Sequence, residues 1–227
     1  MCHKLPDFTS VTHESLLPCC VVRDQGGRVT TVDASGSING HTMIAAGGSD
    51  YALFLYEWKF DHLVLYWRIC EAHSGVISAV LFGTGMVIGV LYSASYDGII
   101  KLWSVSNHEC VAELTYHTAK VVALTQSPDG RYLVSASADG SVLVYDTSTH
   151  YSVISRFFCD DEPISVTILN GYIVCGYSSG AVRLWLLPCI AMTKFLFVCF
   201  EYHKHLWYLS PGQSSTLHRL QSIDVNC

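Results

Sequence analysis

The sequence is poor in charge, and above all in basic residues. Asp, Glu, Lys and Arg make up 14% of its 227 residues, and 13 Lys plus Arg stand against 19 Asp plus Glu, a net charge of −6. A surface that binds nucleic acid through its phosphates needs a basic footprint, which this balance does not supply. Half of the residues are hydrophobic, which argues against disorder, and the length allows one domain or two small ones with a real hydrophobic core.

Paired cysteines are lacking as well. The ten cysteines form no CxxC pair, so the spacing typical of a zinc site is absent. The nearest approach to a metal cluster is Cys199 with His203 and His205, which we interpret as a chance grouping. No metal or cofactor is predicted. The chain also has no N-glycosylation sequon and no signal-peptide core in its first thirty residues. We expect reduced thiols in the cytoplasm, with the nucleus as the alternative.

No apolar run is long enough for a typical membrane helix, which needs about 20 residues. The longest, "LWLLPCIAMTKFLFVCF" at 184–200, has 17 residues and is interrupted by Pro188 and Lys194. A buried pair of strands is the favoured interpretation, and membrane association is the alternative.

The sequence does contain an internal repeat. "SASYDGIIKLWSV" (93–105) aligns with "SASADGSVLVYDT" (135–147) at an offset of 42, the distance from Asp97 to Asp139. A histidine precedes each copy, and His73 and His117 are 44 residues apart. Weaker copies lie at 45–57 and 174–186. The chain therefore carries two clear repeats and two eroded ones.

Each repeat unit predicts four short strands. In the third unit these are 120–126, 132–137, 141–146 and 151–157, separated by turns such as "SPDGR" and "ADG". Both faces of the strands are largely apolar, as expected for a sheet packed between two neighbours. The fourth unit contains Asn170-Gly171, a strong hairpin signal. No stretch of comparable length predicts a helix.

With these features the chain resembles the WD40-repeat family, whose unit has a histidine at its start, an aspartate in the turn after the second strand and a closing Trp-Asp pair. The resemblance implies an all-β propeller of about four four-stranded blades. The expected boundaries are an N-terminal segment 1–20, repeats 21–70, 71–115, 116–158 and 159–188, and a divergent tail 189–227 whose first residues could add a last strand.

Four repeats leave the closure of the propeller open. Either they close as an unusually small ring, or one side stays open and exposes a strand edge and apolar faces through which copies could associate. The abrupt end of the pattern after Pro188 suggests a truncated product of a longer repeat protein.

The repeated Ser, His and Asp have two interpretations. They could form a hydrolytic triad, but a nucleophile needs one site with an oriented base and an oxyanion hole. Here the trio occurs twice, which favours a structural role. The resemblance implies two hydrogen-bonded networks, which consist of His73, Ser93, Asp97 and Trp103, and of His117, Ser135, Asp139 and Tyr145. The one other candidate for catalysis is His203 and His205 with Glu201.

The function implied by the resemblance is a non-catalytic scaffold or adaptor that presents protein partners on one propeller face. Carried over by column, the candidate contacts are Ser74, Val76 and Tyr96 in the second repeat and Thr118, Lys120 and Ala138 in the third. Tyr96 is the preferred anchor, although it could merely cover its own blade. The alternative function is that of a substrate receptor or regulatory part of a larger multidomain protein, and an enzyme is the third possibility.

Overall fold

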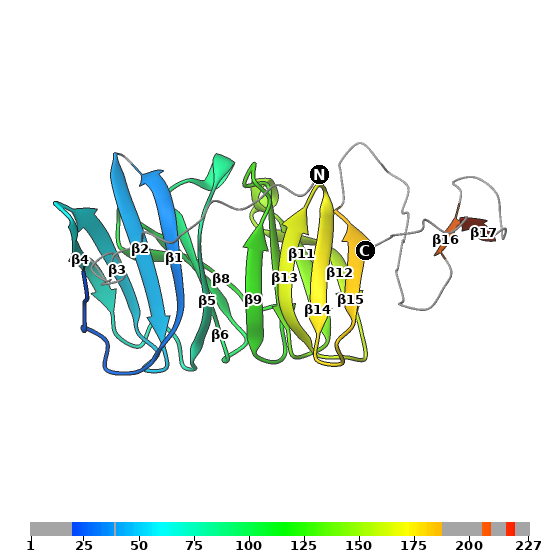
Figure 1. Cartoon of the computed structure of the whole chain (residues 1–227), viewed down its shortest axis with the longest axis horizontal. Helices are drawn as coiled ribbons and strands as arrows, with labels where there is room; N and C mark the ends of the chain where they lie inside the picture. Colours follow the sequence, from blue (N-terminus) through cyan, green and yellow to red (C-terminus); the bar gives the residue numbers. More distant parts are fainter. Residues whose placement is uncertain (1–19, 39, 188–205, 210–216, 221–227) are drawn as a thin grey trace, which may run out of the picture.

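The computed structural model describes residues 20–38, 40–187, 206–209 and 217–220. Four antiparallel sheets, called blades 1 to 4 below, follow one another along the chain and stand side by side in a row (Figure 1). The helical elements of the described residues are two short 3-10 turns, η2 (Gly85–Val87) and η3 (Thr147–Thr149). The predicted all-β propeller of about four blades is confirmed.

Blades 1 to 3 each have four described strands, and blade 4 has three. Blade 1 comprises β1 (Val29–Ile38), β2 (His41–Gly48), β3 (Leu53–Lys59) and β4 (His62–Ile69). Blade 2 comprises β5 (Ile77–Phe82), β6 (Val90–Ser95), β7 (Ile100–Ser104) and β8 (Glu109–Leu114). Blade 3 comprises β9 (Val121–Gln126), β10 (Tyr132–Ser137), β11 (Ser141–Asp146) and β12 (Ser152–Phe158). Blade 4 comprises β13 (Pro163–Leu169), β14 (Tyr172–Tyr177) and β15 (Val182–Leu186).

The turns follow from residues that tolerate a left-handed backbone. Gly98 and Gly140, which follow the two repeated aspartates, have φ of +85° and +80°, values that glycine adopts without strain. Asn170 and Gly171 have φ of +50° and +81°, the pair of positive values that a two-residue type I′ hairpin requires. The hairpin between β13 and β14 therefore forms where the sequence predicts it.

The hydrophobic cores lie between blades, because neighbouring sheets bury the faces that they turn toward each other. Leu55 of blade 1 packs in one cluster with Leu91 of blade 2. Tyr92, on the opposite face of blade 2, packs in a second cluster with Leu133 of blade 3. A third cluster joins blades 3 and 4. Alternation of side chains along a strand places neighbouring residues on opposite faces, which is why both faces are apolar in the sequence.

Polar side chains also connect the blades. On β1, the Thr31 hydroxyl accepts a hydrogen bond from the Val80 amide of β5 at 3.2 Å, and the Asp33 carboxylate accepts one from the Phe82 amide at 2.7 Å. Burial raises the pKa of Asp33, against the effect of this amide. The innermost strands β1, β5, β9 and β13 thus stand next to one another in chain order.

The row of blades is not closed into a ring, and blades 1 and 4 lie at its opposite ends (Figure 1). The segment 189–200, expected to add a fourth strand to blade 4, lies outside the described residues. Within the tail, β16 (Leu206–Leu209) pairs with β17 (Leu217–Leu220) as a two-stranded hairpin. Among the described residues no helix is long and apolar enough to cross a membrane.

Candidate partner-binding face

One rim of the propeller carries the loops that precede the first strand of each blade and the turns that follow the second strand. In blade 2, His73 stands in the loop before β5 and Asp97 in the turn after β6. Their side chains meet, with 3.0 Å between Nδ1 of His73 and the Asp97 carboxylate. We call this rim the loop face.

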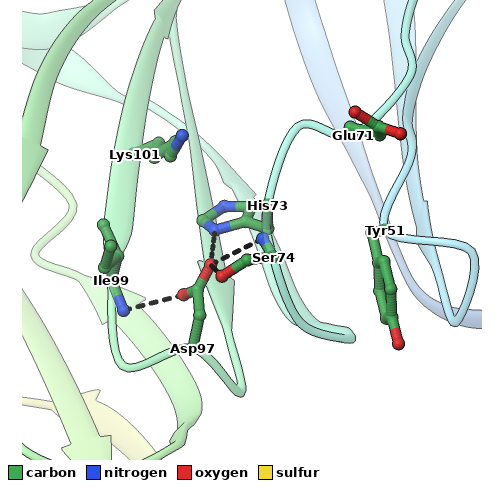
Figure 2. Close-up of a pocket in the computed structure, with 7 residues that line it drawn as sticks. All are labelled: Tyr51, Glu71, His73, Ser74, Asp97, Ile99 and Lys101. Carbon is green, nitrogen blue, oxygen red and sulfur yellow. Dashed lines mark hydrogen bonds and ion pairs between the residues drawn. The ribbon is translucent and has the colours of Figure 1, made fainter.

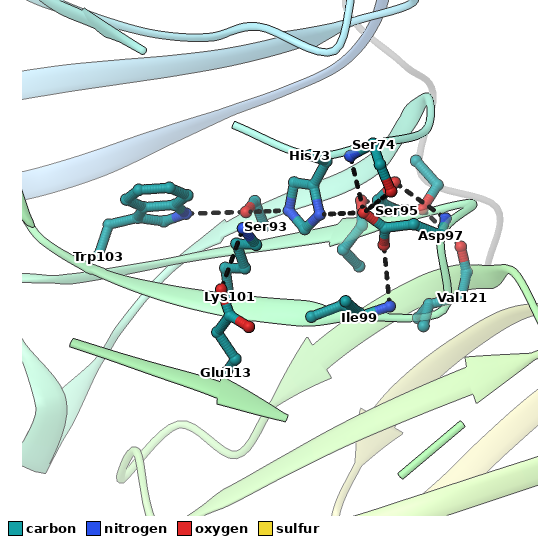
Figure 3. A network of polar contacts seen from close by, with 12 residues as sticks. His73, Ser74, Ser93, Ser95, Asp97, Ile99, Lys101, Trp103, Glu113 and Val121 are labelled. Carbon is teal, nitrogen blue, oxygen red and sulfur yellow. Dashed lines mark hydrogen bonds and ion pairs between the residues drawn. The ribbon is translucent and has the colours of Figure 1, made fainter. Parts of the chain in front are cut away.

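The network of blade 2 runs from the loop face into the core (Figure 3). The indole N–H of Trp103 donates to Ser93 Oγ at 2.8 Å, and Ser93 Oγ lies 2.7 Å from Nε2 of His73. The Asp97 carboxylate also accepts from the backbone amides of Ser74 at 3.0 Å and Ile99 at 2.9 Å. These bonds satisfy polar groups whose burial would otherwise be costly, and they fix the turn against the preceding loop.

Burial sets the protonation of this network. It lowers the pKa of His73, and the nearby Asp97 carboxylate compensates in part. Burial would raise the pKa of Asp97, but the Ile99 amide and His73 outweigh it, so that pKa is lowered. His73 is therefore neutral and Asp97 ionised near neutral pH. Neutral His73 then donates from Nδ1 to Asp97 and accepts the Ser93 hydroxyl proton at Nε2.

Blade 3 repeats the arrangement with one weaker connection. Nδ1 of His117 lies 3.0 Å from the Asp139 carboxylate, and Nε2 lies 2.6 Å from Ser135 Oγ. The hydroxyl of Tyr145 is 3.3 Å from Ser135 Oγ, longer than the indole contact in blade 2. Burial lowers the pKa of His117. Burial opposes ionisation of Asp139, but hydrogen bonds, led by that of Ser141, lower its pKa to about 2.

Sequence comparison by column missed Ser141, although it stands two residues after Asp139. Its hydroxyl donates to the Asp139 carboxylate at 2.5 Å and lies 3.1 Å from Nδ1 of His117. Blade 2 has Ile99 at this position, so the two repeats differ there in chemistry. Ser141 donates to Asp139 through both its hydroxyl and its amide, whereas Ile99 donates to Asp97 through its amide alone.

Blade 4 retains a hydrogen-bonded contact between loop and turn, but here the loop supplies the acceptor and the turn supplies the donors. Asp161, in the loop before β13, accepts hydrogen bonds from the Ser178 hydroxyl at 2.7 Å and the Ser179 amide at 3.4 Å. Cys175 occupies the serine column and is buried, and burial raises the pKa of its thiol to about 11. The carboxylate has therefore moved from the turn to the loop, and the inner His–Ser–Trp chain is absent from the described part of this blade.

The predicted contact residues gather on the loop face in two groups. The Tyr96 amide donates to the Val76 carbonyl at 2.9 Å, and the Ala138 amide donates to the Lys120 carbonyl at 2.9 Å. Ser74 and Thr118 are exposed beside them, Val76, Lys120 and Ala138 are partly exposed, and the Tyr96 side chain is 52% exposed. Each group therefore joins the loop of one blade to the turn of that same blade.

Lys120 connects these groups across three blades. Its Nζ lies 5.7 Å from the centre of the Tyr96 ring in blade 2 and 2.8 Å from the Glu162 carboxylate in blade 4. The hydrogen bond to Glu162 raises the pKa of Lys120. Glu162 was not predicted as a site residue, because the charge it pairs with lies in another repeat.

A pocket of about 490 Å³ opens beside the network of blade 2 (Figure 2). Tyr51 and Glu71 line it on the blade 1 side, and Lys101 lines it on the blade 2 side together with the exposed edge of the network. No group of three or more His, Cys, Asp or Glu side chains in the described part of the chain could hold a metal ion. Cys199, His203, His205 and Glu201 lie outside the described residues.

Comparisons with known proteins agree with this architecture. The family model described as "WD domain, G-beta repeat" matches residues 66–104 and 108–146. "Nuclear distribution protein nudF" of Aspergillus niger is 30% identical over 127 residues, which cover 56% of this chain and 28% of that protein. "Transducin beta-like protein 3" of Bos taurus is 26% identical over 156 residues, 63% of this chain and 19% of that protein. The chain thus spans less than a third of either relative.

Among solved structures, that of the computationally designed Ika4 protein superimposes with a TM-score of 0.62 at 20% identity. It covers 75% of this chain, and the match takes in 98% of the designed protein. At this identity the likeness concerns the fold alone.

Proposed function

We propose that this chain, whose two central repeats match the WD40 family model, is a non-catalytic adaptor that binds one protein partner on its loop face. A protein-interaction role in general follows from the family. The location of the partner site and the absence of catalysis are the parts that we propose. The observation that supports the site most directly is the Tyr96–Lys120–Glu162 series, which spans three blades on one exposed rim.

Tyr96 has the properties of an anchor. Its ring is 52% exposed, its amide is fixed to the Val76 carbonyl, and the next residue, Asp97, is held by the buried network. An aromatic side chain on a rigid turn loses little conformational freedom on binding, and such residues are over-represented among interface hot spots. The nearby Lys120 and Glu162 place both signs of charge beside it, as expected at the polar rim of an interface.

The pocket between blades 1 and 2 suits a polar side chain of the partner. Glu71 and Lys101 supply an acceptor and a donor at its sides, while Ser74 contributes an exposed hydroxyl. Lys101 is already paired with Glu113 at 3.0 Å, so the carboxylates of Glu71 and Asp97 leave the pocket with a net negative charge. We therefore expect the partner to insert a hydrogen-bond donor rather than a phosphate.

The proposal that the chain is not an enzyme rests on the two serines. Ser93 and Ser135 are completely buried, and each is bonded both to a histidine and to the Trp or Tyr of its blade. A nucleophilic oxygen must reach its substrate beside an oxyanion hole. Ser, His and Asp are hydrogen-bonded in the order of a catalytic triad, but the serine hydroxyl oxygens are buried in the protein interior.

The test compares capture of cellular proteins by wild-type chain, Tyr96→Ala and Phe60→Ala. Phe60 is 90% exposed in the turn after β3, on the rim opposite the loop face, so it is a matched aromatic control. We expect a partner whose capture falls at least about tenfold with Tyr96→Ala, the size of a hot-spot loss, and is unchanged with Phe60→Ala. Equal capture by all three would remove Tyr96 from the site.

A thermal melt accompanies each variant. If Tyr96 merely covers its own blade, Tyr96→Ala lowers the melting temperature, whereas an anchor residue leaves it unchanged. We also propose that the adaptor acts in the cytoplasm, where thiols stay reduced. The five described cysteines, Cys20, Cys70, Cys110, Cys159 and Cys175, are all free. Imaging of the tagged chain, with retention in a secretory compartment as the contrary result, tests this placement.

A further inference from the structure

The two ends of the row leave unequal sheet faces. We call the side of a blade that looks toward the preceding blade its front, and the opposite side its back. Strand register places Tyr172, Val182 and Leu186 on the back of blade 4, together with Val174 and Leu184. Among the residues that the structure describes, no further blade packs against this face.

Comparison with blade 3 shows what this face lacks. Val142 and Val144, on the back of blade 3, are 0% exposed because blade 4 covers them. Val182, which stands in the column of Val142, is 55% exposed. Exposed apolar side chains that recur in the columns of an internal interface mark a site for another sheet.

The back of blade 4 is also uncharged. The residues that its three strands place there are hydroxylic, apolar or glycine, namely Ser165, Thr167, Leu169, Tyr172, Val174, Gly176, Val182, Leu184 and Leu186. An occupant that buries this face therefore needs an apolar surface of its own, and a charged peptide or nucleic acid does not fit.

The front of blade 1 is the matching surface in the chain. The fronts of blades 2, 3 and 4 place Leu91, Leu133 and Ile173 against the blade before, and all three are 0% exposed. Blade 1 has Ile44 in this column, and β1 adds Val32, which pairs with Ala46 and is 64% exposed. The inner part of the front of blade 1 is thus apolar and partly open, while at its outer part Arg68 of β4 lies over the Phe54 ring.

The segment before β1 covers the outer part of this front. Val22 packs against Phe54 and Tyr56, and the Gly26 amide donates to the Asp50 carboxylate at 3.0 Å. Ser74 and Thr118 donate to Asp97 and Asp139 in the same way. Residues 20–28 therefore take the position of the loop that, elsewhere, connects the outer strand of one blade to the next blade.

We propose that the back of blade 4 binds the front of blade 1 of a second copy of this chain, head to tail. The contact would repeat, between copies, the blade-to-blade interface that the molecule forms three times within itself. Two copies closed in this way provide eight blades, at the upper end of the range of about four to eight that propellers use. This inference concerns a different surface from the loop face and does not depend on the proposed adaptor function.

Closure explains why a modest face suffices. A specific interface buries about 1,200–2,000 Å² in total, and a ring of two copies makes the head-to-tail contact twice. Each contact then needs to provide only about half of that area. An open head-to-tail chain would instead leave one unsatisfied face at each end and would grow into filaments.

The test uses two exposed valines and a third as control. Val182→Asp places a charge on the back of blade 4, and Val32→Asp places one on the front of blade 1. Val111, 56% exposed on the outer strand β8, provides the matched control Val111→Asp. All three positions are solvent-exposed in the single chain, so each variant should fold, and a cooperative thermal melt checks that it does.

Light scattering coupled to size exclusion, over a hundredfold range of concentration, gives the mass. The wild-type chain and Val111→Asp should approach twice the chain mass of 25.1 kDa, while Val182→Asp and Val32→Asp should each remain at 25.1 kDa. An equimolar mixture of these two variants should recover the two-copy mass, because one intact back meets one intact front. Its dissociation constant should be weaker than that of the wild type, since one contact replaces two.

Three results would overturn the proposal. A wild-type chain that is monomeric at every concentration would show that the back of blade 4 and the front of blade 1 do not bind each other. A Val32→Asp variant that still dimerises would indicate that two blade 4 faces pack back to back. Failure of the mixture to recover the two-copy mass would exclude the head-to-tail geometry itself.

Discussion

Acidification should destabilise blades 2 and 3 well before their carboxylates titrate. Burial lowers the pKa of His73 and His117 below their ordinary value of 6.5. Below pH 6.5 these histidines are therefore protonated in the unfolded chain while they remain neutral in the folded chain. The stability that depends on neutral histidines is present above pH 6.5 and is lost as the pH falls below it. At pH 5.5 each histidine that stays neutral in the fold costs about 1.4 kcal/mol, and the two together cost up to about 3 kcal/mol.

The carboxylates of the same networks act in a different pH range. The pKa values of Asp97 and Asp139 are lowered from the ordinary value of 3.8, so their contribution is present above pH 3.8 and declines only as the pH falls through the lowered values. Between pH 7.5 and pH 5.5 the loss of stability should therefore come from the histidines.

Urea unfolding followed by tryptophan fluorescence at pH 7.5, 6.5 and 5.5 measures this loss. The double variant His73→Gln/His117→Gln should be less stable at pH 7.5 but should show a much flatter dependence on pH. His62→Gln, at the exposed histidine that begins β4, is the control and should keep the wild-type slope. A double variant with an unchanged slope, or a wild type that gains stability on acidification, would refute the assignment of neutral buried histidines.

Two further changes test the blades by denaturant unfolding. Trp103→Phe deletes the indole donor 2.8 Å from Ser93 Oγ and should lower the free energy of unfolding by about 1–2 kcal/mol, because the buried Ser93 hydroxyl loses its donor. Tyr145→Phe deletes a longer contact of 3.3 Å and should lower it by less. The reverse order would show that the two networks are not equivalent. Gly85→Ala places a Cβ 2.0 Å from the Asp129 main-chain oxygen of the neighbouring blade and should lower the free energy of unfolding by more than about 2 kcal/mol. Gly89→Ala is also at positive φ but has no atom within 4 Å. Backbone strain alone should then lower the free energy of unfolding by about 1 kcal/mol. Equal losses for the two glycines would contradict the close approach of blades 2 and 3 at this point.

The interior of the fold could be predicted from the sequence because its repeat is a spacing rule. Blades 2 and 3 repeat the same pattern at offsets of 42 and 44 residues: the turn glycines, the histidine and aspartate columns and the strand ranges. A position assigned in one copy therefore predicts the equivalent position in the other. Both networks of side chains are brought together in the structure as the columns imply. The reason is physical: a buried polar group needs hydrogen-bond partners, and strand register fixes which side chains come within reach of it.

The contacts that the sequence did not reveal are those that break the column rule. Asp161 stands in the histidine column and carries the carboxylate that the turn of blade 4 lacks, so an alignment of like with like overlooks it. Glu162 pairs with Lys120 of another blade, a contact that depends on how blades stack rather than on either repeat alone. Residues 20–28 carry no motif, so the sequence does not predict that they pack against blade 1; only the structure shows it.

The placement of every core between sheets rather than within one also has a consequence for how such a chain can change length. A sheet added at the back of blade 4 would create one new interface and leave the three existing ones untouched, because each blade packs only against its neighbours. Loss of the last sheet would likewise remove one interface and no more. Gene duplication can therefore lengthen or shorten this architecture in steps of one repeat, about 40 residues, without redesign of the part that already folds.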